Sequence, residues 1–126
     1  SDPFAAAKVV ELVCHLKLDV ELVARRCLPE AFFGQTVSDE TKVETQRDLA
    51  KGMKAVGRLM VCDPYAAGAD FTLADLYTFY TFGLANGVAQ KMFNENLLAD
   101  YPQIQELLGR LAERPSIAQV EAAKAG

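Results

Sequence analysis

Residues 71 to 90 read FTLADLYTFYTFGLANGVAQ and contain one charged side chain, Asp75. When this stretch is drawn as a helix, apolar groups fall on every side of it. A helix of that kind is surrounded by protein or by lipid. Asp75, Asn86 and Gln90 disfavour a membrane span, because a central Asp costs about 2.5 to 3.5 kcal/mol on insertion scales. The stretch therefore predicts the buried central helix of a soluble bundle.

The start of this helix carries its own capping signal. Thr72 is followed three residues later by Asp75, which is a shorter variant of the capping box. We expect Thr72 to accept the backbone N–H of the third helical residue and Asp75 to accept the N–H of Thr72. The positive end of the helix dipole favours a carboxylate there. Asp75 is thus predicted to be satisfied locally, with a structural role.

The N-terminal segment predicts a long amphipathic helix. Pro3 suits a first helical turn. Apolar positions then recur three or four residues apart, which forms one stripe of a helix; they are Val9, Val13, Leu16, Val20, Val23 and Cys27. Pro29 and Gly34 interrupt this pattern, and Ser38 or Asp39 can cap the next element.

The remaining elements are also helical. A second amphipathic helix is predicted from about Asp39 to Val61, followed by a turn-rich connector at 63–68. Tyr101-Pro102 marks the start of a short helix, Arg114-Pro115 stops it, and Ile117 and Val120 mark a last short helix. No segment shows the period-2 alternation of a strand. The fold class is therefore all-α, a bundle of about five helices forming one domain over residues 1–126.

Composition excludes several classes of protein. The chain has 126 residues, 51% of them hydrophobic, and a net charge of −4, which suits one compact domain. Neither the first 70 residues nor the rest is basic, so no nucleic-acid partner is expected. The start has neither an initiator Met nor a secretory pattern, which suggests a fragment of a cytoplasmic protein. No membrane association is expected.

Cysteine usage points to free thiols. Cys14, Cys27 and Cys62 form an odd set without a C-x-x-C pair, which argues against a disulfide framework and against a zinc site. Thirteen residues of helix would separate Cys14 from Cys27 by roughly 20 Å, too far for a bridge. A reducing cytoplasm is the expected compartment.

Catalytic patterns are weak. His15 lacks nearby triad partners, and a helix-surface role is favoured over a catalytic base. No glycine loop that binds phosphate is present. Asp19 and Glu21 lie near Arg25 by helical spacing; a surface pair of Glu21 with Arg25 at i,i+4 is favoured, with a polar pocket lined by these residues as the alternative. Cys27, beside two arginines, is the candidate for a reactive thiol. We expect no catalytic residue and no metal ligand, and the substrate-binding residues stay unknown.

Five aromatic residues of the central stretch allow two interpretations. Core packing is favoured, because a nearly uncharged helix must bury its rings. The alternative is a wall on which a ligand stacks. The set comprises Phe71, Tyr77, Phe79, Tyr80 and Phe82.

A family resemblance enters at Gly68-Ala69-Asp70-Phe71-Thr72-Leu73-Ala74-Asp75. This stretch resembles the N-capping motif of the C-terminal domain of glutathione S-transferases. Tyr101-Pro102 and Glu113-Arg114-Pro115-Ser116-Ile117 resemble that family's last two helices, and Asp2-Pro3-Phe4 resembles its interdomain linker. The resemblance covers essentially the whole chain. It implies that Thr72 and Asp75 form the family's capping element, which is important for folding.

The resemblance also implies a function for the parent protein. An N-terminal thioredoxin-like domain, absent from this chain, would bind glutathione as co-substrate and carry the activating residue. The helical domain would form one wall of the pocket for the electrophilic substrate and part of a homodimer interface. By itself it would be inactive, since it would contribute no nucleophile and hold no cofactor. The alternative is a non-catalytic transferase-like helical domain that mediates protein–protein association.

Overall fold

The computed structural model describes residues 3–125, and every regular element within them is helical. Asp2, the first residue of the stretch that resembles the family's interdomain linker, lies outside this range. The elements, in chain order, are α1 (Pro3–His15), the π-helical segment η1 (Leu16–Glu21), α2 (Leu22–Arg25), α3 (Leu28–Phe33), α4 (Asp39–Leu59), α5 (Leu73–Phe93), α6 (Pro102–Ala112) and α7 (Pro115–Ala125).

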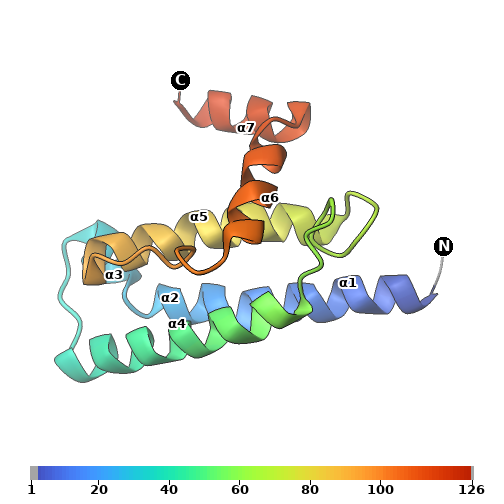
Figure 1. The fold of residues 1–126 in the computed structure, drawn as a ribbon. Coiled ribbons are helices and arrows are strands. Elements are labelled where there is room, and N and C mark those ends of the chain that lie inside the picture. The colour runs from blue at the N-terminus through green and yellow to red at the C-terminus, as the bar shows by residue number, and fades with distance from the viewer. Residues whose placement is uncertain (1–2, 126) are drawn as a thin grey trace.

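Three long helical segments lie side by side and form the main body of the molecule (Figure 1). The first is a continuous rod made of α1, η1 and α2. It runs parallel to α5 and antiparallel to α4 (Figure 1), and η1 packs against both of them. The rod corresponds to the single long helix expected from the sequence. Its π-helical middle was not foreseen, because a widened turn leaves the three-to-four spacing of apolar residues almost unchanged.

Close packing of the rod on α4 depends on Gly52. A Cβ atom added at Gly52 would lie 2.1 Å from the backbone oxygen of Asp19 in η1. No ordinary side chain fits at that distance, so the missing side chain is what lets the two backbones approach.

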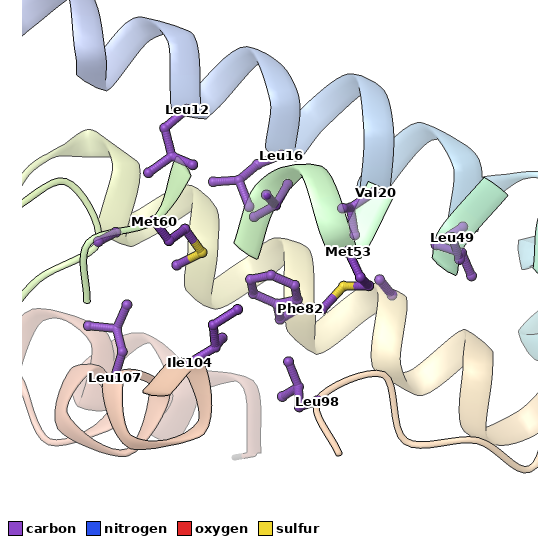
Figure 2. Close-up of a cluster of buried hydrophobic side chains, with 14 of the residues drawn as sticks. Leu12, Leu16, Val20, Leu49, Met53, Met60, Phe82, Leu98, Ile104 and Leu107 are labelled. Atoms are coloured by element: carbon purple, nitrogen blue, oxygen red, sulfur yellow. The ribbon is translucent and has the colours of Figure 1, made fainter. Parts of the chain in front are cut away.

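The core lies where the rod, α4, α5 and α6 meet. Figure 2 shows Phe82 of α5 in the middle of this cluster, with Leu12, Leu16 and Val20 reaching it from the rod. Met53 and Ile104 approach from α4 and α6 (Figure 2), and Phe82 is 1% exposed. A fully buried ring at this position joins four elements into one core.

The C-terminal helices are arranged differently. Helix α6 packs against α5 and stands across it, and α7 packs against α6 above the long helices (Figure 1). Among the α7 side chains that the structure describes, Ile117 is the buried one. We refer to α6 and α7 together as the C-terminal arm.

Two arginines of α6 and the following turn fix the connector between α4 and α5. Arg110 donates to the carbonyl of Pro64 at 2.8 Å. Arg114 donates to the hydroxyl of Tyr65 at 3.1 Å, and its guanidinium lies 3.8 Å from the ring centre of Phe71. The arm is thus attached to the same connector that leads into the capping box of α5.

The all-α prediction is confirmed, with one addition. The rod, α4, α5, α6 and α7 are the five expected helices, whereas α3 was not expected. Pro29 lies in the first turn of α3, and Gly34, with a φ of 69°, ends it. The residues that predicted an interruption therefore bound a short helix. Ser38 caps α4 as expected, accepting the N–H of Thr41 at 3.1 Å.

The membrane alternative finds no support. Within residues 3–125, no helix combines the length and the apolar character that crossing a bilayer requires.

Candidate functional site

The N-terminus of α5 is organised around Asp75, which is fully buried. One carboxyl oxygen of Asp75 accepts the N–H of Thr72 at 2.8 Å, and Thr72 Oγ1 accepts the N–H of Ala74 at 3.2 Å, forming a capping box. The other carboxyl oxygen accepts the N–H of Ala66 at 2.8 Å. Asp75 therefore binds both the helix start and the preceding connector, with one bond to each carboxyl oxygen.

A wide groove lies on the side of α5 beneath the C-terminal arm. Its volume is about 730 Å³, and its lining is mainly apolar. Phe79, Gly83, Asn86 and Gly87 of α5 contribute to its floor, and Leu98, Leu108 and Glu121 contribute from the chain that follows α5. We call this the α5–arm groove. An opening of this size suits a protein element or a drug-sized molecule.

A smaller hollow of about 170 Å³ lies on the opposite side of Tyr80, between α5 and η1. Leu76, Tyr77 and Tyr80 give it an apolar wall, and Glu21 of η1 borders it. Thr81 also lines it; this residue is 2% exposed, and its hydroxyl has no hydrogen-bond partner. We call this the tyrosine hollow. A buried hydroxyl without a partner is costly unless something else bonds to it.

A third, more polar hollow of about 410 Å³ lies between η1, α2 and α4. Arg26 donates to Asp48 across it at 2.7 Å, and Lys51 contributes a further cation. The Arg26 guanidinium is the main reason that the pKa of Asp48 is held below its usual range. The neighbouring charges thus neutralise each other, which is typical of a surface ion pair.

The polar residues singled out on the rod form local pairs. His15 Nδ1 lies 2.6 Å from Asp19 Oδ2, and Arg25 Nε donates to Glu21 Oε2 at 3.0 Å. The surface-pair interpretation of Glu21 and Arg25 is confirmed, although Glu21 also borders the tyrosine hollow. Within residues 3–125, no cluster of His, Cys, Asp and Glu could hold a metal ion.

The three cysteines are free thiols, as predicted. The idea of a reactive thiol at Cys27 is contradicted, because Cys27 is completely buried. Arg25 and Arg26 bond to Glu21 and Asp48 instead of approaching its sulfur. Burial raises the pKa of the Cys62 thiol to about 11. Cys14 is the exposed one.

The aromatic residues follow the core-packing interpretation favoured by the sequence: Phe82 is buried in the core, and Phe71, Tyr77 and Phe79 are half-buried and pack against it. Tyr77, Phe79 and Tyr80 also line the groove or the hollow, whereas a ligand-stacking role stays a prediction. Neither opening was predicted. One feature of the sequence could have indicated them: α5 is apolar on every side, and such a helix needs neighbouring elements on every side. The other helices of this chain leave part of its surface open.

Comparison with known proteins agrees with this architecture. Residues 29–124 match the family "Glutathione S-transferase, C-terminal domain". A protein of Pseudomonas putida named "Glutathione S-transferase" is 40% identical over 124 residues, which are 98% of this chain and 56% of that relative. The chain thus spans just over half the length of this relative. With the match covering three-quarters of an all-helical chain, this protein belongs to the glutathione S-transferase C-terminal domain family.

Proposed function

We propose that this chain is the C-terminal helical domain of a cytoplasmic glutathione transferase. In the complete protein, the thiolate of the co-substrate glutathione attacks an electrophile, and the activating residue lies in an N-terminal thioredoxin-like domain. The helical domain forms one wall of the electrophile pocket and part of a homodimer interface. The observation that carries this proposal is the α5–arm groove. It is an apolar opening along α5, although the sequence of α5 is apolar on every side, as in a helix that protein surrounds completely.

The groove is the docking site we propose for the thioredoxin-like domain. Helix α5 has apolar residues all around, and the rod and α4 cover one side of it. The side beneath the arm stays open over Phe79, Gly83 and Gly87. An apolar opening of this size on one domain is typical of a surface that another part of the protein covers. The relative's extra length supports such a partner domain.

The tyrosine hollow is the wall we propose for the electrophile. Tyr80 lines both openings, so a domain seated in the groove would close the hollow from one side. Small-molecule sites occur preferentially at such domain boundaries. Leu76 and Tyr77 offer apolar contact to the electrophile. The role of this wall is binding, with the nucleophile supplied by glutathione.

The docking proposal is tested with Gly83→Arg. Gly83 is exposed in the groove, and a Cβ atom added there meets nothing within 4 Å. The variant should therefore keep the helical fold while an arginine side chain fills the groove. In the complete gene product we expect loss of glutathione conjugation to chlorodinitrobenzene, and in the 126-residue chain an unchanged melting temperature. Gly109→Arg is the matched control, because Gly109 of α6 is equally open but lies outside the groove.

Two results would contradict the proposal. Full activity of the Gly83→Arg gene product would exclude the groove as the docking site. A complete gene product that neither binds glutathione nor conjugates any electrophile would favour the non-catalytic association domain instead. The 126-residue chain alone should be inactive and should bind an apolar dye, which Gly83→Arg should reduce.

A further inference from the structure

Glu21 is a charged residue that the fold covers to a large extent. It is the last residue of η1, and η1 packs against both α4 and α5. The Glu21 side chain is 20% exposed, whereas that of its partner Arg25 is 48% exposed. A carboxylate loses hydration when protein covers it, and hydrogen bonds or an opposite charge must offset that loss. The partners of each carboxyl oxygen of Glu21 therefore matter.

The two carboxyl oxygens of Glu21 differ in their partners. Oε2 accepts the Nε–H of Arg25 at 3.0 Å. Within residues 3–125 the structure shows no hydrogen bond to Oε1. The bond to Arg25, one turn further along the rod, restricts the orientation of the carboxylate. One oxygen is thus bonded within this chain, and the other can accept a bond from a ligand.

Aromatic and charged groups meet in the tyrosine hollow. Glu21 borders it from η1, and Tyr77 and Tyr80 line it from α5. In the part of the chain that the structure describes, Glu21 is the one charged residue of this lining. Arg25 lies outside the lining, and Asp75, the one acid of α5, is buried with both carboxyl oxygens bonded. A ligand in the hollow would therefore meet a negative charge and two aromatic side chains.

We propose that the tyrosine hollow binds the cationic end of an electrophile, an alkylammonium group in contact with Glu21 Oε1 and the rings of Tyr77 and Tyr80. This inference rests on the proposed function and names the class of substrate that the pocket wall selects. Aromatic rings attract cations through the negative potential of their faces, more strongly where water is displaced. A neutral end would gain apolar contact alone, and Glu21 would repel a carboxylate.

The volume of the hollow fits one end of such a molecule. The hollow measures about 170 Å³, whereas a drug-sized ligand occupies a site of about 300 to 1,000 Å³. The reactive carbon of an aryl halide would then lie outside the hollow, on the side that the thioredoxin-like domain is proposed to close. There the glutathione sulfur forms a bond to that carbon, the bond from carbon to halogen breaks, and halide leaves with its electron pair. The hollow binds and orients the substrate.

Two ligands of the same shape test the preference for charge. Choline and 3,3-dimethylbutan-1-ol differ in one central atom, which is positively charged nitrogen in choline and neutral carbon in the alcohol. We expect the complete gene product to bind choline about tenfold more tightly, as measured by NMR titration. Glu21→Gln should remove most of this preference. Glu11→Gln is the matched control, because it removes the same charge about 15 Å away along the same rod, outside the hollow.

Substitutions at Tyr77 test the aromatic contact. Tyr77→Phe keeps the ring and should keep the preference for choline. Tyr77→Leu keeps an apolar wall without a ring, so it should reduce the preference by about threefold while the alcohol binds as before. A purely structural role of Tyr77 would change the binding of both ligands together.

Conjugation kinetics extend the test to substrates. Chlorodinitrobenzene, 4-chloro-3-nitrophenyltrimethylammonium and 4-chloro-3-nitrobenzoate share a chloronitrophenyl ring and differ in the charge of the group opposite the chlorine. Glu21→Gln should lower kcat/KM about tenfold for the cation, leave it within about twofold for the neutral compound and raise it for the benzoate, because the charged ends meet the carboxylate. Comparing original and variant for each substrate cancels differences in intrinsic reactivity.

The inference is overturned if choline binds no more tightly than the alcohol, or if Glu21→Gln and Glu11→Gln change the preference equally. An equal effect of Glu21→Gln on all three substrates would also overturn it, since the charge of the substrate would then not matter. Choline binding needs no glutathione. A gene product that binds choline through Glu21 but conjugates no electrophile would contradict the proposed function and support the cation site, whereas conjugation without a charge preference would contradict this inference alone.

Discussion

The two sides of α5 differ in how completely this chain covers them. The side toward the rod and α4, which we call the sealed side, is closed except for the tyrosine hollow: Asp75, Phe82, Ala85 and Val88 are buried, and Gly52 lets the backbones of α4 and η1 touch. Beneath the C-terminal arm the same helix borders a groove of about 730 Å³. The sealed side explains how the chain folds, and the open side is the surface that we propose for docking of a partner domain.

Removing the carboxyl group of Asp75 should disturb the sealed side most. Asp75→Ala leaves the buried N–H of Ala66 and the half-buried N–H of Thr72 without an acceptor, each costing about 1 to 3 kcal/mol. We expect the free energy of unfolding in urea to fall by about 4 kcal/mol, beyond the 1 to 2 kcal/mol typical of losing a cap alone. Asp75→Asn keeps one acceptor oxygen and should lose less. Equal stability of Asp75→Ala and the original chain would refute the structural role.

Filling the contact at Gly52 should be nearly as harmful. In Gly52→Ala the new methyl group would collide with the backbone of η1, which cannot move as a flexible side chain could. Overpacking of this kind costs typically about 1 to 3 kcal/mol, and we expect the upper end of that range. Urea unfolding measures the loss. A variant as stable as the original would mean that rod and α4 are less closely packed than described.

Weakening the attachment of the C-terminal arm should cost less stability than the two changes above, and its effect should stay within the arm. Ile117→Ala removes the buried anchor of α7 and should cost about 2 kcal/mol. Because α7 packs against α6, the disturbance should stay within the arm. Hydrogen exchange should accelerate in 115–125 while α4 and α5 keep their protection. Equal acceleration in the rod would show that arm and bundle unfold as one unit.

The smallest expected effect is a gain in stability from a substitution at Gly109. Gly109 of α6 is exposed, and a Cβ atom there meets nothing within 4 Å. Gly109→Ala should therefore raise the free energy of unfolding by about 0.5 to 1 kcal/mol, because alanine favours a helix over glycine. Thermal melting checks this. A glycine-to-alanine substitution would then lower the free energy of unfolding at Gly52 of α4 and raise it at Gly109 of α6.

Local patterns predicted the helices well for a physical reason. The three-to-four spacing from Val9 to Cys27 and the cap at Ser38 depend on neighbours within a few residues, so both could be inferred from the sequence. The π-helical turn of η1 and the short helix α3 were missed. Here η1 packs against α4 and α5, and α3 packs against α5, so both elements contact residues far away in the chain.

Fewer features of the candidate site could be predicted from the sequence. The pairing of Glu21 with Arg25 follows from helical spacing and was predicted, whereas the bond from Ala66 to Asp75 joins residues across a loop and was not. The burial of Cys27 also overturned its suggested reactivity, since neighbours in sequence did not reveal what covers the sulfur.

The sequence by itself determined that this protein is an all-helical domain with a capped, apolar central helix, and its motifs indicated the family. Those features arise from short-range interactions, in which periodicity, caps and proline positions act directly on the local backbone. Only the tertiary structure decided which side of α5 is sealed, where the groove and the tyrosine hollow lie, and which stripe of the rod stays exposed. Each of these depends on where α4, α6 and α7 come to lie, and long-range packing sets that position.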